Sequence, residues 1–335
     1  MDLNACLLQI QKYLENNPVI ILGSGASAAY GLPSMTSLSN ELKQHESKFD
    51  PTEFSELCHN LDAMNIEEAI DKTSLSEGSS NMLREIVWNY INEKDLLQFN
   101  RLLRDRKDYA IAELLRVMIG TAMNTATVIT TNYDRLVEYA ADIIGATAIT
   151  GFEGHLIRAL ELPNANISRK RVRARERIVN IWKVHGSLDW FANSTDEIVS
   201  FPLMQSIPEN HKPLIIAPGK GKYNFTHNEP YRDVITQADS AFSSAGSFLC
   251  VGYGFNDSHI QPKLIEQIKN GKPIVVICQT ATEECKRNVI STEVKKYVVI
   301  DQSANGKTSV TGTDYSEVFD GDFWNLPEFI KTIWR

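Results

Sequence analysis

The apolar run at residues 19–22 and the small residues that follow it constrain the fold of this chain more than any other segment. Four consecutive apolar residues are typical of a parallel strand that is buried on both faces. The residues after them, Gly23 to Ser27, predict a turn onto a helix N-terminus, where backbone N–H groups can hold a phosphate. Gly31 follows Gly25 after five residues, whereas the dinucleotide-binding fingerprint has two at this point. The run therefore predicts a nucleotide site, but not one of the common fingerprint type.

Short runs rich in Val and Ile return along the chain and alternate with segments of helical periodicity. They lie at residues 127–131, 178–185, 213–217, 248–252, 273–278 and 297–300. This alternation predicts an α/β fold with a doubly wound parallel, Rossmann-like sheet. Ligands of such sheets bind beyond the carboxyl ends of the strands. The polar residues just after each strand are therefore the candidate site residues.

The segments of helical periodicity divide the chain into two expected parts, a helical insertion and a Rossmann-like domain. Residues 36–119 are helical in pattern and contain no convincing strand, so we expect a helical insertion subdomain there. Residues 1–35 and 120–335 are then expected to form the Rossmann-like domain. Residues 187–228, rich in Pro, Gly, Asn and Ser, are expected to cover the site as a loop rather than form a core.

An amphipathic helix is predicted ahead of the first strand. Leu3, Leu7, Ile10 and Leu14 recur at spacings of three to four residues, and Pro18 is expected to end the helix. Its apolar face is expected to pack internally, with an assembly surface as the alternative.

Composition narrows the class of protein. With 335 residues, of which 43% are hydrophobic, the chain can bury a substantial core. It has no apolar stretch of membrane-spanning length and no basic start typical of a secretory signal. The five cysteines include no Cys-x-x-Cys pair, which argues against a disulfide framework and a thiolate zinc site. We expect a cytoplasmic protein without a metal.

The charge distribution argues against general nucleic-acid binding, because the net charge is −8. One basic segment, residues 169–177, is the exception. If it were extended, its alternating arginines would share one face. The pattern is typical of a solvated arm, or alternatively of a contact for an acidic partner or a nucleic acid.

Two polar segments follow the second and third predicted strands of the sheet. Thr131, Asn132 and Asp134 come after the second strand, and His185 with Gly186 comes after the third. Together with the opening loop, these segments resemble the sirtuin family. Its members have a glycine-alanine-serine loop leading to Gly-Ile-Pro, a Thr-Gln-Asn-Ile-Asp segment and a His-Gly pair, in this order.

The resemblance implies an NAD site with Asn132, Asp134 and His185 as catalytic residues. Asn132 and Asp134 would lie beside the nicotinamide ribose, and His185 would be the general base. The residues expected to bind NAD are Gly23, Ser24, Gly25, Ala26, Ser27, Pro33, Thr131, Gly252, Tyr253, Gly254, Asn256 and Gln279.

The chemistry of NAD agrees with these roles. Its nicotinamide is already a cationic leaving group, so the enzyme has only to stabilise an oxocarbenium-like transition state and position a nucleophile. A histidine can accept a proton from water or a ribose hydroxyl near neutral pH. The alternatives are structural: Asn132 or Asp134 could cap the following helix, and His185 could be a satisfied, half-buried histidine.

A fourth segment follows the strand at residues 248–252. It stands where sirtuins carry a Gly-Thr-Ser loop for phosphate and ribose, with Tyr253 and Gly254 in place of the Thr and Ser. In its form Val-Gly-Tyr-Gly-Phe-Asn-Asp, it resembles a bacterial branch of sirtuin-like antiviral defence proteins. Gln279 and Asp301 are candidates for adenosine contacts, or simply polar loop residues.

The chain departs from sirtuin deacylases in two places. Ser34, Met35 and Thr36 follow Pro33, where deacylases carry Asp-Phe-Arg, and the two Cys-x-x-Cys pairs of their zinc module are missing. The resemblance therefore implies an NAD hydrolase that yields nicotinamide and ADP-ribose or a cyclic form, as an anti-phage effector. The alternatives are a protein deacylase, an ADP-ribosyltransferase and a non-catalytic NAD or ADP-ribose sensor. Homo-oligomers and a HerA-type ATPase are the partners that the resemblance implies.

Overall fold

The computed structural model describes residues 1–334 except 108, 121–123, 163–175, 220–227 and 258–259. Its described strands form two sheets. The larger sheet comprises β1 (Pro18–Leu22), β2 (Thr125–Thr130), β3 (Thr147–Ile149), β6 (Ile178–Lys183), β10 (Ser247–Val251), β11 (Ile274–Ile277), β12 (Tyr297–Gln302), β13 (Thr308–Gly312) and β14 (Tyr315–Phe319). The smaller sheet comprises β4 (Phe152–Gly154), β5 (Arg158–Leu160), β7 (Gly186–Asn193), β8 (Ile198–Ser200) and β9 (His211–Ile215).

The larger sheet has the predicted doubly wound, parallel core. Its order is β14-β13-β12-β11-β10-β1-β2-β6-β3, with β1 near the centre and parallel pairing from β12 to β3. β13 and β14 extend it as antiparallel strands. The loops after β1 and its neighbours therefore open at one edge of the sheet.

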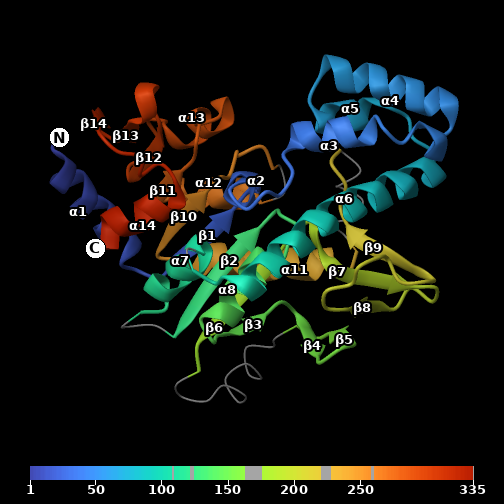
Figure 1. The fold of residues 1–335 in the computed structure, drawn as a ribbon. Coiled ribbons are helices and arrows are strands. Elements are labelled where there is room, and N and C mark those ends of the chain that lie inside the picture. Colours follow the sequence, from blue (N-terminus) through green and yellow to red (C-terminus); the bar gives the residue numbers. More distant parts are fainter. Residues whose placement is uncertain (108, 121–123, 163–175, 220–227, 258–259, 335) are drawn as a thin grey trace.

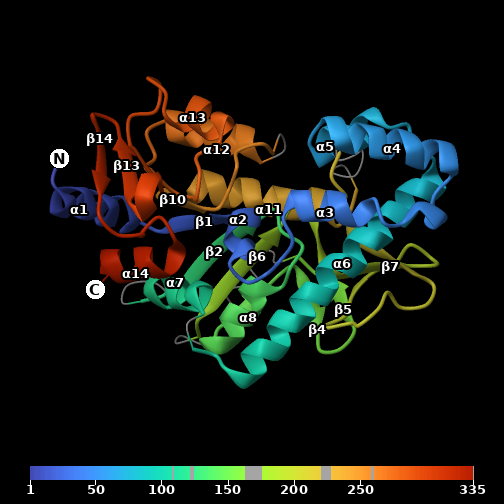
Figure 2. The ribbon, with the colours of Figure 1, turned by 45° about the horizontal axis from the view of Figure 1, so that its top comes forward.

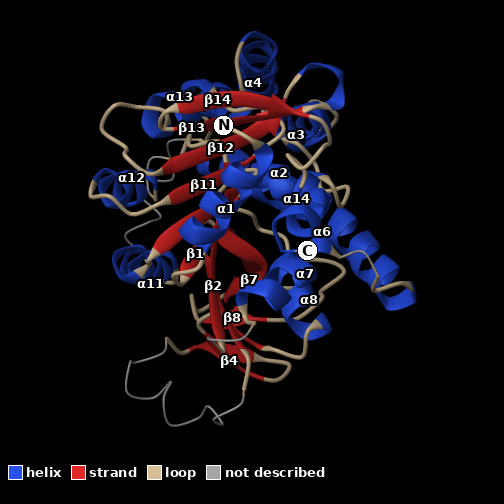
Figure 3. Cartoon of the chain, turned by 90° about the vertical axis from the view of Figure 1, so that its left-hand side faces the viewer, coloured by secondary structure: helices blue, strands red, loops and turns tan. Residues whose placement is uncertain are grey.

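Both faces of this sheet are covered by helices, which explains its continuous apolar strands. Ile20 and Leu22 of β1 pack into one core, and Val19 and Ile21 pack into the other. The first core includes side chains of α1 (Leu3–Leu14), α7 (Ala110–Met118), α8 (Leu136–Ile143) and α14 (Leu326–Trp334). The second includes side chains of α11 (Tyr231–Ser244), α12 (Gln261–Lys269) and α13 (Glu283–Val289). Figure 3 shows helices on both sides of the stacked strands.

The helix predicted at the N-terminus is confirmed as α1, and it buries Cys6, Ile10 and Leu14. Pro18 does not end it, because α1 stops at Leu14 and Pro18 is already the first residue of β1. The apolar face of α1 packs internally, on β10, β11 and α14.

The described residues between β1 and β2 form only helices, turns and coil. The helices are α2 (Ser24–Ala28), α3 (Met35–Leu42), the 3-10 turn Glu46–Lys48, α4 (Pro51–Ala63), α5 (Ile66–Lys72), α6 (Glu77–Arg104) and α7. Figures 1 and 2 show α3, α4 and α5 grouped around one end of the long α6. α7 packs instead on α8, β2 and α14. The subdomain boundaries at 36 and 119 stay a prediction.

The second sheet corrects the expectation that residues 187–228 are a covering loop. Residues 187–193, 198–200 and 211–215 are strands, and the sheet order is β4-β5-β8-β7-β9 with antiparallel pairing. Trp190 and Phe191 are fully buried, so the segment contributes large side chains to the core. β9 therefore belongs to this sheet and not to the parallel one.

The two remaining sequence predictions concern surfaces. The basic segment at residues 169–177 lies outside the described residues apart from Glu176 and Arg177. Arg177 donates a hydrogen bond to the Ile144 carbonyl at 3.3 Å. Among the described residues, no helix is long and apolar enough to cross a membrane.

Candidate functional site

The loops after β1, β2, β6 and β10 meet around one cavity of about 980 Å³ at the carboxyl edge of the sheet. Its size is at the upper end of the range for small-molecule sites. Eleven of the predicted site residues line it: Gly23, Ser24, Ser27, Pro33, Thr131, Asn132, Asp134, His185, Tyr253, Gly254 and Asn256. The structure thus brings together residues from four widely separated parts of the sequence.

Asn132 is held by the loop after β1. Its Nδ2 donates hydrogen bonds to the Gly23 carbonyl at 2.9 Å and to Ser27 Oγ at 2.8 Å. Its backbone N–H donates to Thr130 Oγ1 at 3.0 Å. The Asn132 side chain does not cap the next helix, since α8 begins only at Leu136. Both protons of the amide are engaged, so the side chain has a fixed orientation at the cavity wall.

Asp134 combines a helix-capping contact with a contact to the loop after β1. Its Oδ1 accepts the Leu136 N–H at 3.2 Å, as a helix cap does, and its Oδ2 accepts the Ser27 hydroxyl at 2.6 Å. Burial raises the pKa of this carboxyl, although Lys183 and Ser27 oppose the shift. Ser27 therefore links Asp134 to Asn132, and Asp134 orients the loop at the edge of the cavity.

Three glycines allow the loops after β1 and β10 to touch. The Gly25 N–H donates to the Gly252 carbonyl at 3.1 Å. A Cβ on Gly252, whose φ is +58°, would lie 2.2 Å from the Ala26 nitrogen, and one on Gly23 would lie 2.4 Å from the Gly252 oxygen. These glycines are required by backbone packing, in addition to any role in phosphate binding.

The remaining residues predicted to bind NAD do not line this cavity. Gly25, Ala26, Gly252 and Gln279 line a second cavity of about 500 Å³, next to Arg101, Lys107, Tyr109 and Trp324. Asp301 lines neither cavity and accepts the Ala281 N–H at 3.4 Å. The structure therefore does not bring Gln279 and Asp301 to the cavity that holds Asn132 and His185.

His185 lies between β6 and β7 and is buried. Its carbonyl accepts the Ile216 N–H at 2.9 Å, which ties it to the chain after β9. Gly186, at φ +88°, allows the turn because a Cβ there would lie 2.0 Å from the Leu214 oxygen. The Nε2 atom of His185 lies 2.6 Å from Oδ2 of Asp257. The sequence pattern gives Asp257 no role, although it ends the fourth polar segment.

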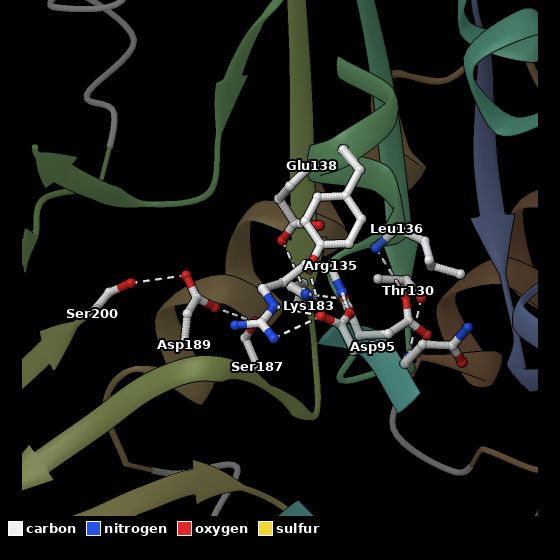
Figure 4. A network of polar contacts seen from close by, with 12 residues as sticks. Asp95, Thr130, Arg135, Leu136, Glu138, Lys183, Ser187, Asp189 and Ser200 are labelled. Carbon is white, nitrogen blue, oxygen red and sulfur yellow. Dashed lines mark hydrogen bonds and ion pairs between the residues drawn. The ribbon is translucent and has the colours of Figure 1, made fainter. Parts of the chain in front are cut away.

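A buried polar network supports the site (Figure 4). Arg135 and Asp95 form an ion pair at 2.6 Å, with side-chain exposures of 4% and 0%, and the Arg135 N–H donates to Asp95 Oδ1 at 2.7 Å. Lys183 donates to the Asp134 carbonyl and pairs with Glu138 at 2.9 Å. Helix α6, which carries Asp95, is thereby bonded to the residue next to Asp134.

The cavity has an acidic lining. Six carboxylate residues line it: Glu67, Glu68, Asp71, Asp134, Asp257 and Glu284. No lysine or arginine stands among the described residues that line it. Within the described ranges, no cluster of three or more His, Cys, Asp or Glu side chains is arranged to hold a metal ion.

A comparison with known protein families supports the resemblance to sirtuins over part of the chain. A family model described as a SIR2-like domain matches residues 126–288. This span contains Asn132, Asp134, His185 and Asp257. No curated protein sequence matches the chain.

Several solved structures resemble the chain at low identity. One, described as "Structural Basis for the Mechanism and Regulation of Sir2 Enzymes", has a TM-score of 0.48 and 15% identity, covering 98% of both chains. A Sir2 homologue in complex with NAD has a TM-score of 0.47 and 16% identity, covering 89% of this chain and 88% of that chain. Sir2Tm bound to a propionylated peptide has a TM-score of 0.42 and 14% identity, covering 83% and 88%. Similarities of this strength do not assign a function.

Proposed function

We propose that the protein is an NAD hydrolase that cleaves the nicotinamide N-glycosidic bond in the cavity lined by Asn132 and His185. The observation that carries the proposal is the convergence of the loop after β1, the fixed amide of Asn132 and the buried imidazole of His185 on one cavity. The SIR2-like match over this region supports the choice of NAD as the substrate.

In the proposed reaction, the bond between C1′ of the ribose and the nicotinamide nitrogen breaks, and its electron pair neutralises the ring. Water then attacks C1′ of the oxocarbenium-like centre, and its proton passes to His185. The products are nicotinamide and ADP-ribose, or a cyclic form if a group of the same molecule replaces water. Asn132 holds the ribose and the nucleophile in place, Ser27 fixes Asn132 through its hydroxyl, and Ser24 contacts the diphosphate.

The segment after Pro33 favours water over a peptide as the partner of the ribosyl centre. Ser34 caps α3 by accepting the Ser37 N–H at 3.1 Å, so the chain enters a helix where deacylases carry Asp-Phe-Arg. Pro33, Ser34 and Met35 line the cavity, and they provide no aromatic shield over the ribose. We therefore place hydrolysis ahead of deacylation and of ADP-ribosyl transfer.

The biological role is proposed from the resemblance to defence proteins. We propose that the protein depletes NAD during phage infection, acts in the cytoplasm and works as a homo-oligomer, with a HerA-type ATPase as a candidate partner. Light scattering at increasing protein concentration, combined with turnover at each concentration, tests the link between assembly and activity. A monomer with full activity at every concentration would contradict it.

The reaction itself is tested by product analysis. Purified protein is incubated with NAD and an acetylated peptide, and nicotinamide, ADP-ribose and deacetylated peptide are quantified. We expect nicotinamide and ADP-ribose in equal amounts and unchanged peptide. Asn132→Ala and His185→Ala should each lower the rate at least about 100-fold, the scale of a general acid–base contribution. Release that survives both substitutions contradicts the mechanism, and NAD binding without release indicates a sensor.

A further inference from the structure

The contact between His185 and Asp257 joins two loops that are far apart in the sequence. Nε2 of His185 and Oδ2 of Asp257 lie 2.6 Å apart, and each side chain is only 6% exposed. The carboxylate oxygen lies outside hydrogen-bond geometry for Nε2. At this distance the carboxylate charge biases which ring nitrogen of His185 carries the proton.

Asp257 is itself fixed at the start of α12. Its other oxygen, Oδ1, accepts the Ile260 N–H at 3.1 Å, and its carbonyl accepts the Gln261 N–H at 3.2 Å. His185 is fixed on the opposite side through the Ile216 N–H. Because both backbones are bonded to neighbouring elements, the carboxylate and the imidazole have a set relative position. Burial of both groups strengthens their electrostatic interaction.

We propose that Asp257 is a positioning residue for His185. A carboxylate beside Nε2 favours the neutral tautomer that carries its proton on Nε2, which leaves the lone pair on Nδ1 to accept the proton from water. When Nδ1 takes that proton, the ring becomes a cation, and the Asp257 anion stabilises it without itself being protonated. This assignment rests on the proposed function, since it makes His185 the general base.

One substitution distinguishes the positioning role of Asp257 from a purely structural role. In Asp257→Asn, the amide oxygen can still accept the Ile260 N–H, because asparagine keeps a carbonyl acceptor in the same place. The negative charge beside His185 is lost. If Asp257 serves only to begin α12, the variant behaves like the wild type. If it positions His185, the proton distribution on the ring and the catalytic rate both change.

The first measurement uses nitrogen-15 NMR of the unliganded full-length chain with labelled histidines. The chain has seven histidines, and His185→Gln identifies the signals of interest. We expect the wild-type spectrum to show a protonated Nε2 and an unprotonated Nδ1. Asp257→Asn should shift both signals toward the averaged values of exchanging tautomers, and Asp257→Glu should restore the wild-type pattern at least in part.

The second measurement separates binding from turnover. Asp257→Asn should leave the Kd for NAD within about twofold and lower kcat about 10- to 100-fold, as removal of an orienting partner does. Asp257→Glu should recover part of kcat. The matched control is Asp320→Asn, which removes a carboxylate from an exposed pair with Lys307 and should change neither quantity.

The two proposals fail in different ways. Histidine signals that are the same in the wild type and Asp257→Asn overturn the positioning role, whether or not NAD is cleaved. A wild type that shows the tautomer pattern but releases no nicotinamide overturns the hydrolase function and leaves the orientation of His185 by Asp257 standing. A fall in NAD affinity with unchanged kcat also overturns the positioning role, because it makes Asp257 a binding residue.

Discussion

Single residues decide how closely the loops of this cavity approach one another. Ser27 receives a hydrogen bond from Asn132 and donates one to Asp134, so one hydroxyl connects two of the proposed catalytic side chains. Gly252 passes so close to Ala26 that no side chain fits between them. The geometry of the site therefore depends on small residues that carry no catalytic chemistry themselves.

Gly252→Ala is expected to destabilise the fold. The new Cβ would lie 2.2 Å from the Ala26 nitrogen in a left-handed conformation, so we expect a loss of about 3 kcal/mol from overpacking and backbone strain together. Gly271→Ala is the control, since Gly271 has φ +93° but a Cβ there would meet no atom within 4 Å, and it should lose only about 1–2 kcal/mol. Urea unfolding measures both, and equal losses would show that the loop contact is unimportant.

Asp134→Asn is expected to change the pH dependence of stability. Burial raises the pKa of Asp134 in the folded chain, so the folded state holds a proton that the unfolded state has already released. The wild type therefore loses stability as the pH rises from about 4, the ordinary value for aspartate, through the raised pKa. The variant lacks this loss, so its free energy of unfolding relative to the wild type should rise over that interval. Urea titrations from about pH 4 to 8 check it, and a constant difference would refute it.

At the scale of elements, α6 holds the loop between β2 and α8 in place. The ion pair between Asp95 on α6 and Arg135 is buried, and Tyr139 OH donates to the same carboxylate at 2.5 Å. Trp88 on α6 donates to the Leu188 carbonyl of β7 at 2.9 Å. One helix thus contacts both the segment that carries Asn132 and the strand that follows His185.

Asp95→Ala is expected to lower the free energy of unfolding by about 3–5 kcal/mol, because it leaves the Arg135 guanidinium buried without its carboxylate. It should also slow NAD cleavage, since the Arg135 N–H loses its acceptor next to Asp134. Glu283→Ala removes an exposed pair with Lys286 and should leave the unfolding midpoint unchanged. Denaturant unfolding separates the two variants, and similar midpoints would show that the buried pair does not hold α6.

The sequence predicts the elements whose signal is local. The strand at residues 19–22, the alternation of strands and helices and the amphipathic α1 all follow from periodicity. Most of the smaller sheet has no such signal, because three of its strands have only three residues and β7 lies in a segment rich in turn formers. Of its strands, only β9 overlaps a predicted one, at residues 213–217, and periodicity does not show which sheet it joins. The contact of Asp257 with His185 is not predictable either, because it depends on how β6 and β10 are placed in the sheet, and no spacing in the sequence encodes that.

At the scale of the whole molecule, the parallel sheet brings four loops to one edge, and residues of α3, α5 and the segment after β9 enclose them. Leu38 of α3, Ile66 of α5 and Pro218 after β9 all line the same cavity. Proteins bind ligands at this edge of doubly wound sheets because the strand ends leave a crevice there. The cavity is thus a product of the overall topology.

Bound NAD is expected to stabilise the whole fold. In His185→Ala, which should bind NAD without consuming it, a free concentration about 100-fold above Kd raises the free energy of unfolding by about 2.7 kcal/mol. Ser24→Trp, which places an indole in the cavity beside the β1 loop, should abolish the effect. Thermal unfolding with and without NAD checks both variants. If NAD stabilises Ser24→Trp as much as it stabilises His185→Ala, NAD binds outside this cavity.

The most direct test of the central claim is nicotinamide release by the purified chain, followed over a range of protein concentrations, with Asn132→Ala as the matched variant. We expect the folded wild type to release nicotinamide and ADP-ribose, or its cyclic form, in equal amounts, and the rate of release by folded Asn132→Ala to be at least about 100-fold lower. Absence of release at every concentration, or release that is the same in both proteins, would contradict it.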